Sequence, residues 1–348
     1  MNSITQKERI VSLDIIRGLA LFGILFINVG AFQIVVDGGT MPDYSGLNGI
    51  IDILINIFIE KKFFSIFSFL FGIGFYIFAS RAEKRGDRPR WRFARRLFAL
   101  LLIGIIHFVI FWGSILAIYA IIGFFLIPFY KVSVSTLSKW LGGIIIIHII
   151  SLFLNLFAPE MTIFSTVVDF FGNDVFTIFL MFLSGFLVAK ADLLRRISKL
   201  SKQIRWIQIG LLPIFIGFSI WIWFASHGNN QDIQSIIALG VIPMTFFYLS
   251  SLFLMLENKR IVKFLKPVAY VGHMAFTNYV AQSFIGIAII SLMGLEAVSP
   301  NHIVIIAILI YMVQIIFSII WFQFFNMGPL EKVWRFMTYG RNTITKQK

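Results

Sequence analysis

Long apolar stretches of about twenty residues alternate with short polar segments along the whole chain. A stretch of this length is what a helix needs to cross the hydrocarbon core of a bilayer. The pattern predicts ten membrane-spanning helices, at about 15–36, 63–80, 97–112, 114–130, 137–157, 174–190, 206–226, 233–256, 268–293 and 303–325. No internal repeat or linker interrupts them, so we expect one all-α helical bundle in a single membrane domain, residues 1–348.

One segment between two spans, 37–62, has a pattern of its own. It carries polar residues at steps of four, at Asn48, Asp52, Asn56 and Glu60, while isoleucine, leucine and phenylalanine fill the other faces. This spacing predicts an amphipathic helix at about 48–60. We expect that helix either to lie on the outer membrane face or to pack over the bundle.

The composition excludes a soluble protein. Hydrophobic residues make up 59% of the 348 and charged residues only 13%, and no soluble fold of this size can bury so much apolar side chain. The chain has no cysteine, which excludes thiol nucleophiles, disulfides and Cys-ligated metals. The five histidines are scattered without metal-ligand spacing, so we expect no metal site.

The charge of +14 follows the positive-inside rule. In the ten-span arrangement, 28 of the 30 basic residues fall on one side, and only Lys61 and Lys62 fall on the other. Both termini are therefore expected in the cytoplasm, and the chain in the cytoplasmic (plasma) membrane of a bacterium. We expect the basic face to meet anionic lipid headgroups, which leaves no need for a nucleic-acid partner. A homo-oligomer is compatible with the sequence.

The first span carries three polar residues on one face. Asp14, Arg17 and Asn28 are three and eleven residues apart, which at 100° per residue leaves Arg17 and Asn28 about 20° from each other. Asn28 then lies about 16 Å above Arg17, near the bilayer midplane. The three residues either bind substrate, or Asp14 and Arg17 form an interfacial ion pair while Asn28 joins two helices.

Two further spans place polar side chains at depth. His107 lies about 16 Å past Arg96, where a neutral imidazole either acts as an acid–base group or makes one interhelical hydrogen bond. Asn278 and Gln282 are an i, i+4 pair that either binds a polar group or carbonyl of a substrate, or holds a neighbouring helix. Together with Asn28, these residues predict a polar cluster near the midplane.

Small residues four apart in the second span predict close helix packing. Ser68 and Gly72 lie on one face of that span, so a neighbouring backbone can approach it there.

The chain resembles the YeiB-like bacterial membrane proteins, which carry domain of unknown function 418. The resemblance covers nearly the whole chain and is carried by these stretches: Leu13 to Asn28, Lys62 to Gly74, Arg95 to Leu97 leading to Gly104 to His107, Asn278 to Ser283, and Gly328 to Arg335. Two positions depart from the family pattern: Ser114 stands where the family usually has an aspartate, and His273 where it tends to have an arginine.

The first span is also similar to that of membrane acyltransferases, which take acyl groups from cytoplasmic acyl-CoA. The acyltransferase-3 pattern has a histidine eleven positions after its arginine, whereas Arg17 is followed at that distance by Asn28. Asparagine cannot be a general base. The resemblance therefore implies Arg17 as a ligand for the phosphates of acyl-CoA, and we expect His107 as the catalytic base.

Three functions agree with these residues. The first is a membrane-embedded acyltransferase with acyl-CoA as co-substrate and a membrane or extracytoplasmic acceptor, in which Asn28, Asn278 and Gln282 polarise the thioester carbonyl. The second is a transporter for a small polar or lipidic solute, although every acidic residue falls at a membrane edge or in a loop. The third is a non-catalytic membrane component. The sequence does not identify the substrate.

Overall fold

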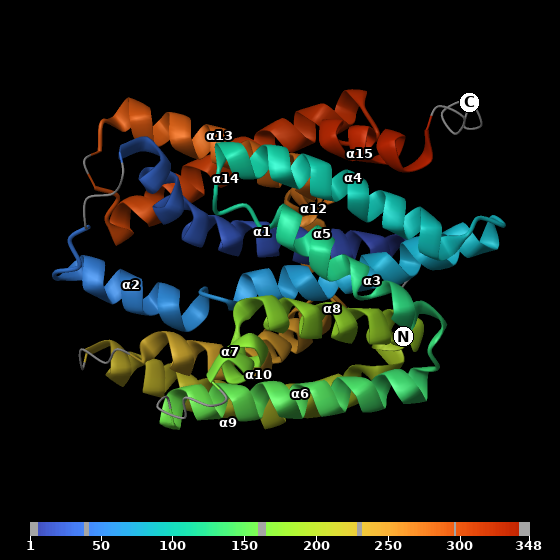
Figure 1. The fold of residues 1–348 in the computed structure, drawn as a ribbon. Coiled ribbons are helices and arrows are strands. Elements are labelled where there is room, and N and C mark those ends of the chain that lie inside the picture. The colour runs from blue at the N-terminus through green and yellow to red at the C-terminus, as the bar shows by residue number, and fades with distance from the viewer. Residues whose placement is uncertain (1–5, 38–41, 159–164, 228–231, 296, 341–348) are drawn as a thin grey trace.

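The computed structural model describes residues 6–37, 42–158, 165–227, 232–295 and 297–340, and within these ranges it is helical without a strand. Most of the long helices lie side by side along one common direction (Figure 1). The elements are α1 Gln6–Asp37, α2 Leu47–Phe58, α3 Lys62–Lys84, α4 Pro89–Ile110, α5 Leu116–Phe124, η1 Ile127–Lys131, α6 Val134–Phe157, α7 Ser165–Gly172, α8 Asp174–Lys190, η2 Leu193–Arg196, α9 Ile197–His227, α10 Ile233–Met255, α11 Lys259–Phe264, α12 Lys266–His273, α13 Ala275–Met293, α14 Pro300–Phe324 and α15 Pro329–Tyr339.

The predicted fold class, a polytopic helical bundle, is confirmed. In the described part of the chain, eight helices are long and apolar enough to cross a membrane, and a ninth span is formed if α7 and α8, bent by 46°, are counted as one. Large apolar side chains point outward from α6, α9 and α14, where Ile150, Ile216 and Ile316 are all about half exposed. In water such a surface would be unstable, whereas lipid tails solvate it.

The fourth predicted span, 114–130, differs from the structure. Helix α5 has only nine residues, about 14 Å of rise, which is half of a hydrocarbon core. The next turn is the 3-10 helix η1, which contains Pro128, and a proline cannot continue the α-helical hydrogen-bond ladder. Helices α4 and α5 pack against each other as a hairpin instead of forming two full spans.

Helix α2 corresponds to the predicted amphipathic helix and packs onto the bundle, while its external position stays a prediction. It contacts α9 and α14, and Ile53, Ile55 and Ile57 are buried there. In Figure 1 it lies beyond the end of α3 and points along a similar direction. The Lys62 ammonium, fully buried at the junction, donates a hydrogen bond of 2.6 Å to the Asn56 carbonyl oxygen. This bond satisfies a carbonyl in the last turn of α2.

Of the two small residues predicted to allow close packing, Gly72 does so between α3 and α8, whereas the Ser68 hydroxyl bonds to Tyr119. A Cβ atom at Gly72 would overlap the Phe182 carbonyl oxygen, and one at Gly185 would overlap the Phe69 carbonyl oxygen. The two backbones therefore approach as only small residues allow.

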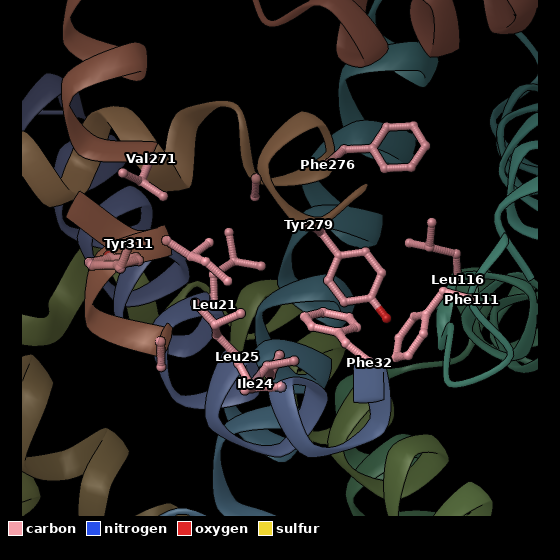
Figure 2. Packing of buried hydrophobic residues seen from close by; sticks show 14 of the residues in the cluster. Leu21, Ile24, Leu25, Phe32, Phe111, Leu116, Val271, Phe276, Tyr279 and Tyr311 are labelled. Atoms are coloured by element: carbon pink, nitrogen blue, oxygen red, sulfur yellow. The ribbon is translucent and has the colours of Figure 1, made fainter. Parts of the chain in front are cut away.

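Helix α1 lies inside the bundle and organises one hydrophobic core. Leu21, Leu25 and Phe32 are completely buried, and the side chains of Tyr279 and Phe111 pack around them (Figure 2). A spanning helix enclosed by other helices can carry polar side chains that never meet lipid.

The ninth predicted span, 268–293, is broken into α12 and α13 at Met274. Gly272 makes this arrangement fit, because a Cβ atom there would overlap the Asp14 carbonyl oxygen of α1. The break leaves the first N–H groups of α13 inside the protein, close to the charged residues of α1. Broken helices of this kind are tolerated in membranes where the freed backbone groups find protein partners.

The connection between α3 and α4, which is rich in arginine, lies toward the same end of the bundle as α15 (Figure 1). By the positive-inside rule this is the cytoplasmic end. The cytoplasmic position of both termini stays a prediction, and residues 1–5 and 341–348 lie outside the described residues.

Candidate functional site

A cavity of about 230 Å³ lies between α1, α3, α4, α5, α12, α13 and α15. Its charged lining comes from four helices and consists of Arg17, Arg96, His273 and Glu331. The rest of the lining is almost entirely apolar or aromatic. Because Arg17, Arg96 and Glu331 lie toward the basic end of the bundle, the cavity is polar at that end and apolar farther into the bundle.

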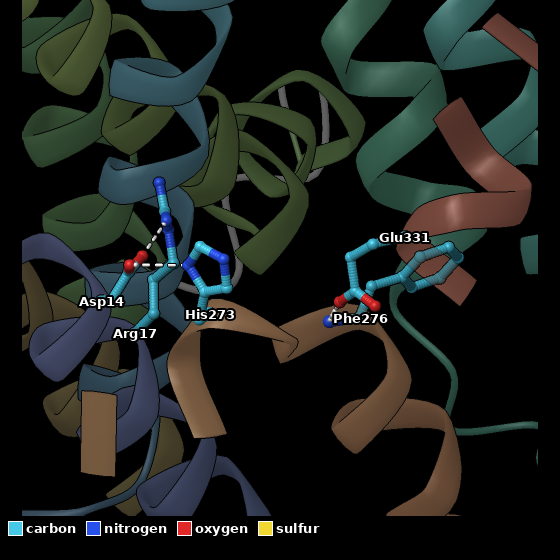
Figure 3. A network of polar contacts seen from close by, with 5 residues as sticks. All are labelled: Asp14, Arg17, His273, Phe276 and Glu331. Atoms are coloured by element: carbon cyan, nitrogen blue, oxygen red, sulfur yellow. Dashed lines mark hydrogen bonds and ion pairs between the residues drawn. The ribbon is translucent and has the colours of Figure 1, made fainter. Parts of the chain in front are cut away.

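Asp14 links the first helix to the broken helix at this polar end. Its carboxylate accepts a hydrogen bond of 2.6 Å from Arg17 Nη1 through one oxygen and contacts His273 Nδ1 at 3.0 Å through the other (Figure 3). The Asp14 side chain is 7% exposed, whereas that of His273 is 48% exposed. The predicted Asp14–Arg17 pair is therefore present, and it is joined by a third residue.

The Asp14 contact also favours the protonated form of His273. This residue precedes α13, the part of the broken helix that is long enough to span a membrane. The hydrogen bond from the imidazole to the carboxylate raises the pKa of His273, and burial opposes this effect without cancelling it. No described residue makes a hydrogen bond to the other ring nitrogen, Nε2. An imidazole held through Nδ1 by a carboxylate, with Nε2 left open, is oriented as a general base requires.

Glu331 of α15 occupies the N-terminus of α13. One carboxylate oxygen accepts a hydrogen bond from the backbone N–H of Phe276 at 2.8 Å (Figure 3). The same oxygen accepts the N–H of Thr277 at 3.2 Å, and the other oxygen accepts a hydrogen bond from the Thr277 hydroxyl. A carboxylate at a helix N-terminus also interacts favourably with the helix dipole. Glu331 thus satisfies the backbone that the break in the ninth span leaves open.

Arg96 and Trp334 form the wall between α4 and α15. The Arg96 guanidinium lies 3.7 Å from the centre of the Trp334 ring, and the indole N–H donates to the Arg96 carbonyl oxygen at 2.8 Å. Arg95 holds the same helix by donating to the Met337 carbonyl oxygen. These contacts dock α15 against α4 beside the polar end of the cavity.

The predicted midplane cluster is divided by the structure into two networks. In the first, His107 Nδ1 lies 2.8 Å from Ser114 Oγ, and Nε2 lies 3.1 Å from Ser283 Oγ. The Tyr279 hydroxyl interacts with the side chains of Ser114 and Asn28. Asn28 and His107 therefore belong to one network, which runs behind the part of the cavity lined by Tyr279.

The second network joins α13 to α14. Asn278 donates to Ser318 Oγ at 3.1 Å and to the Val271 carbonyl oxygen at 3.0 Å, and Gln282 donates to Gln314 Oε1 at 3.0 Å. These four side chains are buried, and among the residues of the second network no side chain lines the cavity. Asn278 and Gln282 thus contact a neighbouring helix, one of the two arrangements expected for them, and their role in substrate binding stays a prediction.

His107 is likewise absent from the cavity lining. It is 2% exposed, and both ring nitrogens already have serine partners. Its catalytic role stays a prediction, which the geometry does not favour, because a general base needs an open nitrogen within reach of the acceptor. Among the described residues, no group of histidine, aspartate and glutamate side chains could hold a metal ion.

The fold and the cavity define a polytopic helical bundle suited to a membrane, with a partly charged cavity toward its basic end. The chain belongs to the DUF418 family, whose model, "Protein of unknown function (DUF418)", matches residues 188–341. It is 32% identical to the "Uncharacterized 39.9 kDa protein in amylase 3'region" of Bacillus acidopullulyticus, over 98% of this chain and 97% of that protein. It is 30% identical to the "Uncharacterized protein YxaH" of Bacillus subtilis strain 168, over 96% and 95%.

A third relative agrees with the sequence-based recognition. The "Uncharacterized protein YeiB" of Escherichia coli K12 is 24% identical over 95% of this chain and 96% of its own length. No solved structure matches the chain. The family is therefore established, while the names of these three relatives state no activity.

The sequence did not single out Arg96, Glu331 or Trp334 as site residues. Glu331 and Trp334 lie in the C-terminal segment, which the charge pattern treated only as part of the basic cytoplasmic side. One signal was present: Leu330, Val333, Trp334 and Met337 recur at helical spacing, which gives this segment an apolar face. A tryptophan on such a helix indicates docking against the bundle.

Proposed function

We propose that this protein is a membrane-embedded acyltransferase of the bacterial cytoplasmic membrane that takes its acyl group from a cytoplasmic acyl-CoA. The observation that carries the proposal is the position of the Asp14–His273 pair, which opens on the same cavity as two arginines and an apolar interior. An acyl thioester has matching parts, namely a hydrocarbon chain, a polarised carbonyl group and a polyanionic carrier.

His273 takes the role of the general base in this proposal. Its Nε2 accepts a proton from an acceptor hydroxyl or amine, while Asp14 holds Nδ1 and stabilises the imidazolium. The acceptor atom bonds to the acyl carbon as the carbon–sulfur bond breaks, and the proton passes to the leaving thiolate. Arg17 and the basic cytoplasmic surface supply donors for the phosphates of the carrier. The same basic surface suits anionic lipid headgroups.

The absence of cysteine makes a direct assay available. Purified protein in nanodiscs of bacterial lipid is mixed with octanoyl-CoA, and the released thiol is measured with a colorimetric thiol reagent that has no site on the chain. We expect thiol release by the wild type and a loss of about 100-fold in His273→Gln and Asp14→Asn, the usual contribution of a general base. His227→Gln is the matched control, since His227 is exposed and, among the described residues, bonds to its own helix at the Trp223 carbonyl oxygen.

Two results would overturn the proposal. The first is no thiol release by the wild type with short, medium or long acyl-CoA. The second is wild-type turnover in His273→Gln. Loss of turnover in His107→Gln but not in His273→Gln would identify His107, the residue predicted from the sequence, as the general base. Accumulation of a solute in sealed vesicles without thioester cleavage would support the transporter instead.

A further inference from the structure

The Arg96 guanidinium is a cation without a partner in the part of the chain that the structure describes. Arg17 has Asp14, and Arg92 has Asp87 at 3.0 Å, but no described carboxylate lies within ion-pair distance of Arg96. Its side-chain nitrogens donate to no described acceptor. The guanidinium instead lies between two aromatic rings, 3.7 Å from the Trp334 centre and 4.7 Å from that of Phe78.

The carboxylate of Glu331, near Arg96, already accepts hydrogen bonds from other groups. Glu331 interacts electrostatically with Arg96, but its two oxygens accept the backbone N–H groups and the hydroxyl at the start of α13. Since Arg96 lines the cavity, its free donors are available to a ligand oxygen there. A guanidinium held flat between aromatic rings is pre-oriented to bind such an oxygen.

The apolar part of the cavity has a definite depth. On α1 its lining runs from Arg17 to Ile24, and on α3 from Phe75 to Phe67, which are seven and eight residue steps and therefore about 10–12 Å of helix. That depth suits a chain of medium length, such as an octanoyl group. The volume of about 230 Å³ is below the 300–1,000 Å³ common for ligand pockets, which suits a single acyl chain.

Two tyrosines close the deep end. The Tyr119 hydroxyl bonds to Ser68 Oγ at 2.6 Å and to the Phe64 carbonyl oxygen at 3.0 Å. The Tyr279 hydroxyl accepts the backbone N–H of Ile115 at 3.1 Å. Because both hydroxyl groups are bonded, neither ring can turn aside without losing hydrogen bonds.

From this geometry we infer that the cavity binds the acyl group of a medium-chain carboxyl compound, with its carbonyl or carboxylate oxygen at Arg96 and its chain enclosed as far as Tyr119 and Tyr279. The inference deepens the proposed function, because it concerns the same cavity. The oxygen has two sources that share this chemistry: a thioester, whose carbonyl becomes an oxyanion during transfer, and a free fatty acid.

Gly74 gives a way to fill the cavity without disturbing the fold. It lines the cavity, and a Cβ atom built on it meets no atom within 4 Å. Gly217, on the exposed helix α9, has equally open surroundings and does not line the cavity. Gly74→Leu therefore tests occupancy, and Gly217→Leu is its matched control.

The experiment measures binding of radiolabelled octanoyl-CoA and octanoate to the protein in nanodiscs, with empty nanodiscs subtracted. Acetyl, octanoyl and palmitoyl competitors are compared. We expect octanoyl compounds to bind at least tenfold more tightly than the other two lengths, and Gly74→Leu but not Gly217→Leu to abolish binding. Phe67→Ala, which removes a ring at the deep end, should shift the preference toward longer chains.

Arg96 is tested against its neighbour. Arg95 and Arg96 both contact α15, so Arg95→Gln reproduces any loosening of that helix without removing the donor in the cavity. We expect at least a tenfold weaker affinity in Arg96→Gln and less than a twofold change in Arg95→Gln. Equal effects of both variants, equal affinity for all three chain lengths, or unchanged binding in Gly74→Leu would overturn the inference.

The outcome separates the inference from the proposed function. Octanoate that binds as well as octanoyl-CoA, without thioester cleavage, would leave the inference standing and remove the acyltransferase proposal. Thioester cleavage at the same rate for every chain length, and unchanged in Arg96→Gln, would support the acyltransferase proposal and remove the inference. Tighter binding of octanoyl-CoA than of octanoate identifies the thioester as the source.

Discussion

The His273 ring contacts the Asp14 carboxylate at 3.0 Å, although 259 positions separate the two residues along the chain. Gly272 permits this contact by letting α12 lie against the backbone of α1. One buried carboxylate thereby serves both His273 and Arg17, and it fixes the broken helix to the first helix. The polar end of the cavity depends on this relationship.

Removing Asp14 should cost more than removing the whole Asp14–Arg17 pair. Asp14→Asn leaves the Arg17 charge without its partner, and we expect it to destabilise the protein by about 2 kcal/mol. The double variant with Arg17→Gln should lose less than the sum of the single variants. Thermal unfolding of the four proteins in one detergent measures this coupling.

A matched pair elsewhere on the chain controls for geometry. Asp192 and Arg195 have the same i, i+3 spacing at 3.2 Å, but their side chains are 49% and 62% exposed. Solvent screening should leave their coupling near zero. Simply additive losses at Asp14 and Arg17 would show that the buried contact contributes no more than the exposed one.

Because the pKa of His273 is raised, we expect protein stability and turnover to change in opposite directions with pH. The Asp14 hydrogen bond favours the charged imidazole, so its stabilisation is complete below the ordinary pKa of about 6.5 and is lost as pH rises through the raised value. Turnover should rise over the same range, because a general base must be unprotonated. Arg17 and Glu331 are the other charges that act on this ring.

Unfolding temperature and initial thiol-release rate, each followed from pH 6 to pH 9 (about the range around an ordinary histidine pKa), check this prediction. His273→Gln and Asp14→Asn should each flatten the stability profile. A wild-type protein whose stability does not change between these pH values would contradict the assigned contact.

The crossing of α3 and α8 should tolerate no added methyl group. Gly185→Ala places a Cβ atom on the Phe69 carbonyl oxygen, and Gly72→Ala places one on that of Phe182. Two backbones must then separate, at a cost of about 2 kcal/mol or more in each variant. Gly217→Ala, which meets no atom within 4 Å, should unfold at or above the wild-type temperature. Unchanged unfolding temperatures at Gly72 and Gly185 would contradict the close approach.

The helical class and this small-residue packing could be predicted because both follow from local patterns. Apolar length indicates a span, and the four-residue spacing of Ser68 and Gly72 indicates a face on which backbones can meet. The Asp14–Arg17 pair was accessible for the same reason, since both residues lie on one helix. The short helix α5 could not be predicted. Gly113 and Pro128 interrupt the apolar run there, but the composition of that run is that of a full span.

The cavity could not be predicted, since its charged residues come from four distant segments. Arg96 is one of eight basic residues between positions 81 and 96, and its position in the cavity depends on how α15 packs. His273 was noted only as a departure from the family pattern, because the break at Met274 is not visible in the hydropathy. Depth alone grouped Asn28, His107, Asn278 and Gln282. In the structure Asn278 and Gln282 bond to α14, whereas Asn28 and His107 interact with Tyr279 and Ser283 of α13, which separates the four residues into two networks.

The membrane orientation can be tested by single cysteines in this cysteine-free chain. Cysteine at Asp43 or Asp169, both exposed, should react with a membrane-impermeant thiol reagent on intact cells, while cysteine at Lys199 or Lys263 should react only after lysis. Glu160 and Glu296 are also predicted to be external but lie outside the described residues. Labelling of the lysine positions on intact cells would reverse the assigned orientation.

His107 distinguishes a structural role from a catalytic one. Its ring nitrogens join Ser114 to Ser283, so His107→Ala leaves two buried hydroxyl groups without this partner and opens a small cavity. We expect a loss of about 2–4 kcal/mol of stability from these two effects together. Octanoyl-CoA affinity should stay within a factor of about two, since His107 does not line the cavity.

His107→Gln is the informative companion, because its amide can restore at least one of the serine hydrogen bonds. It should recover part of the lost unfolding temperature and retain most of the turnover. A catalytic His107 would give the reverse pattern, in which both variants lose turnover by about 100-fold while their unfolding temperatures remain close to that of the wild type. That pattern would show that the acid–base group lies in the sealed network around Tyr279 and that the Asp14–His273 pair only stabilises the polar end of the cavity.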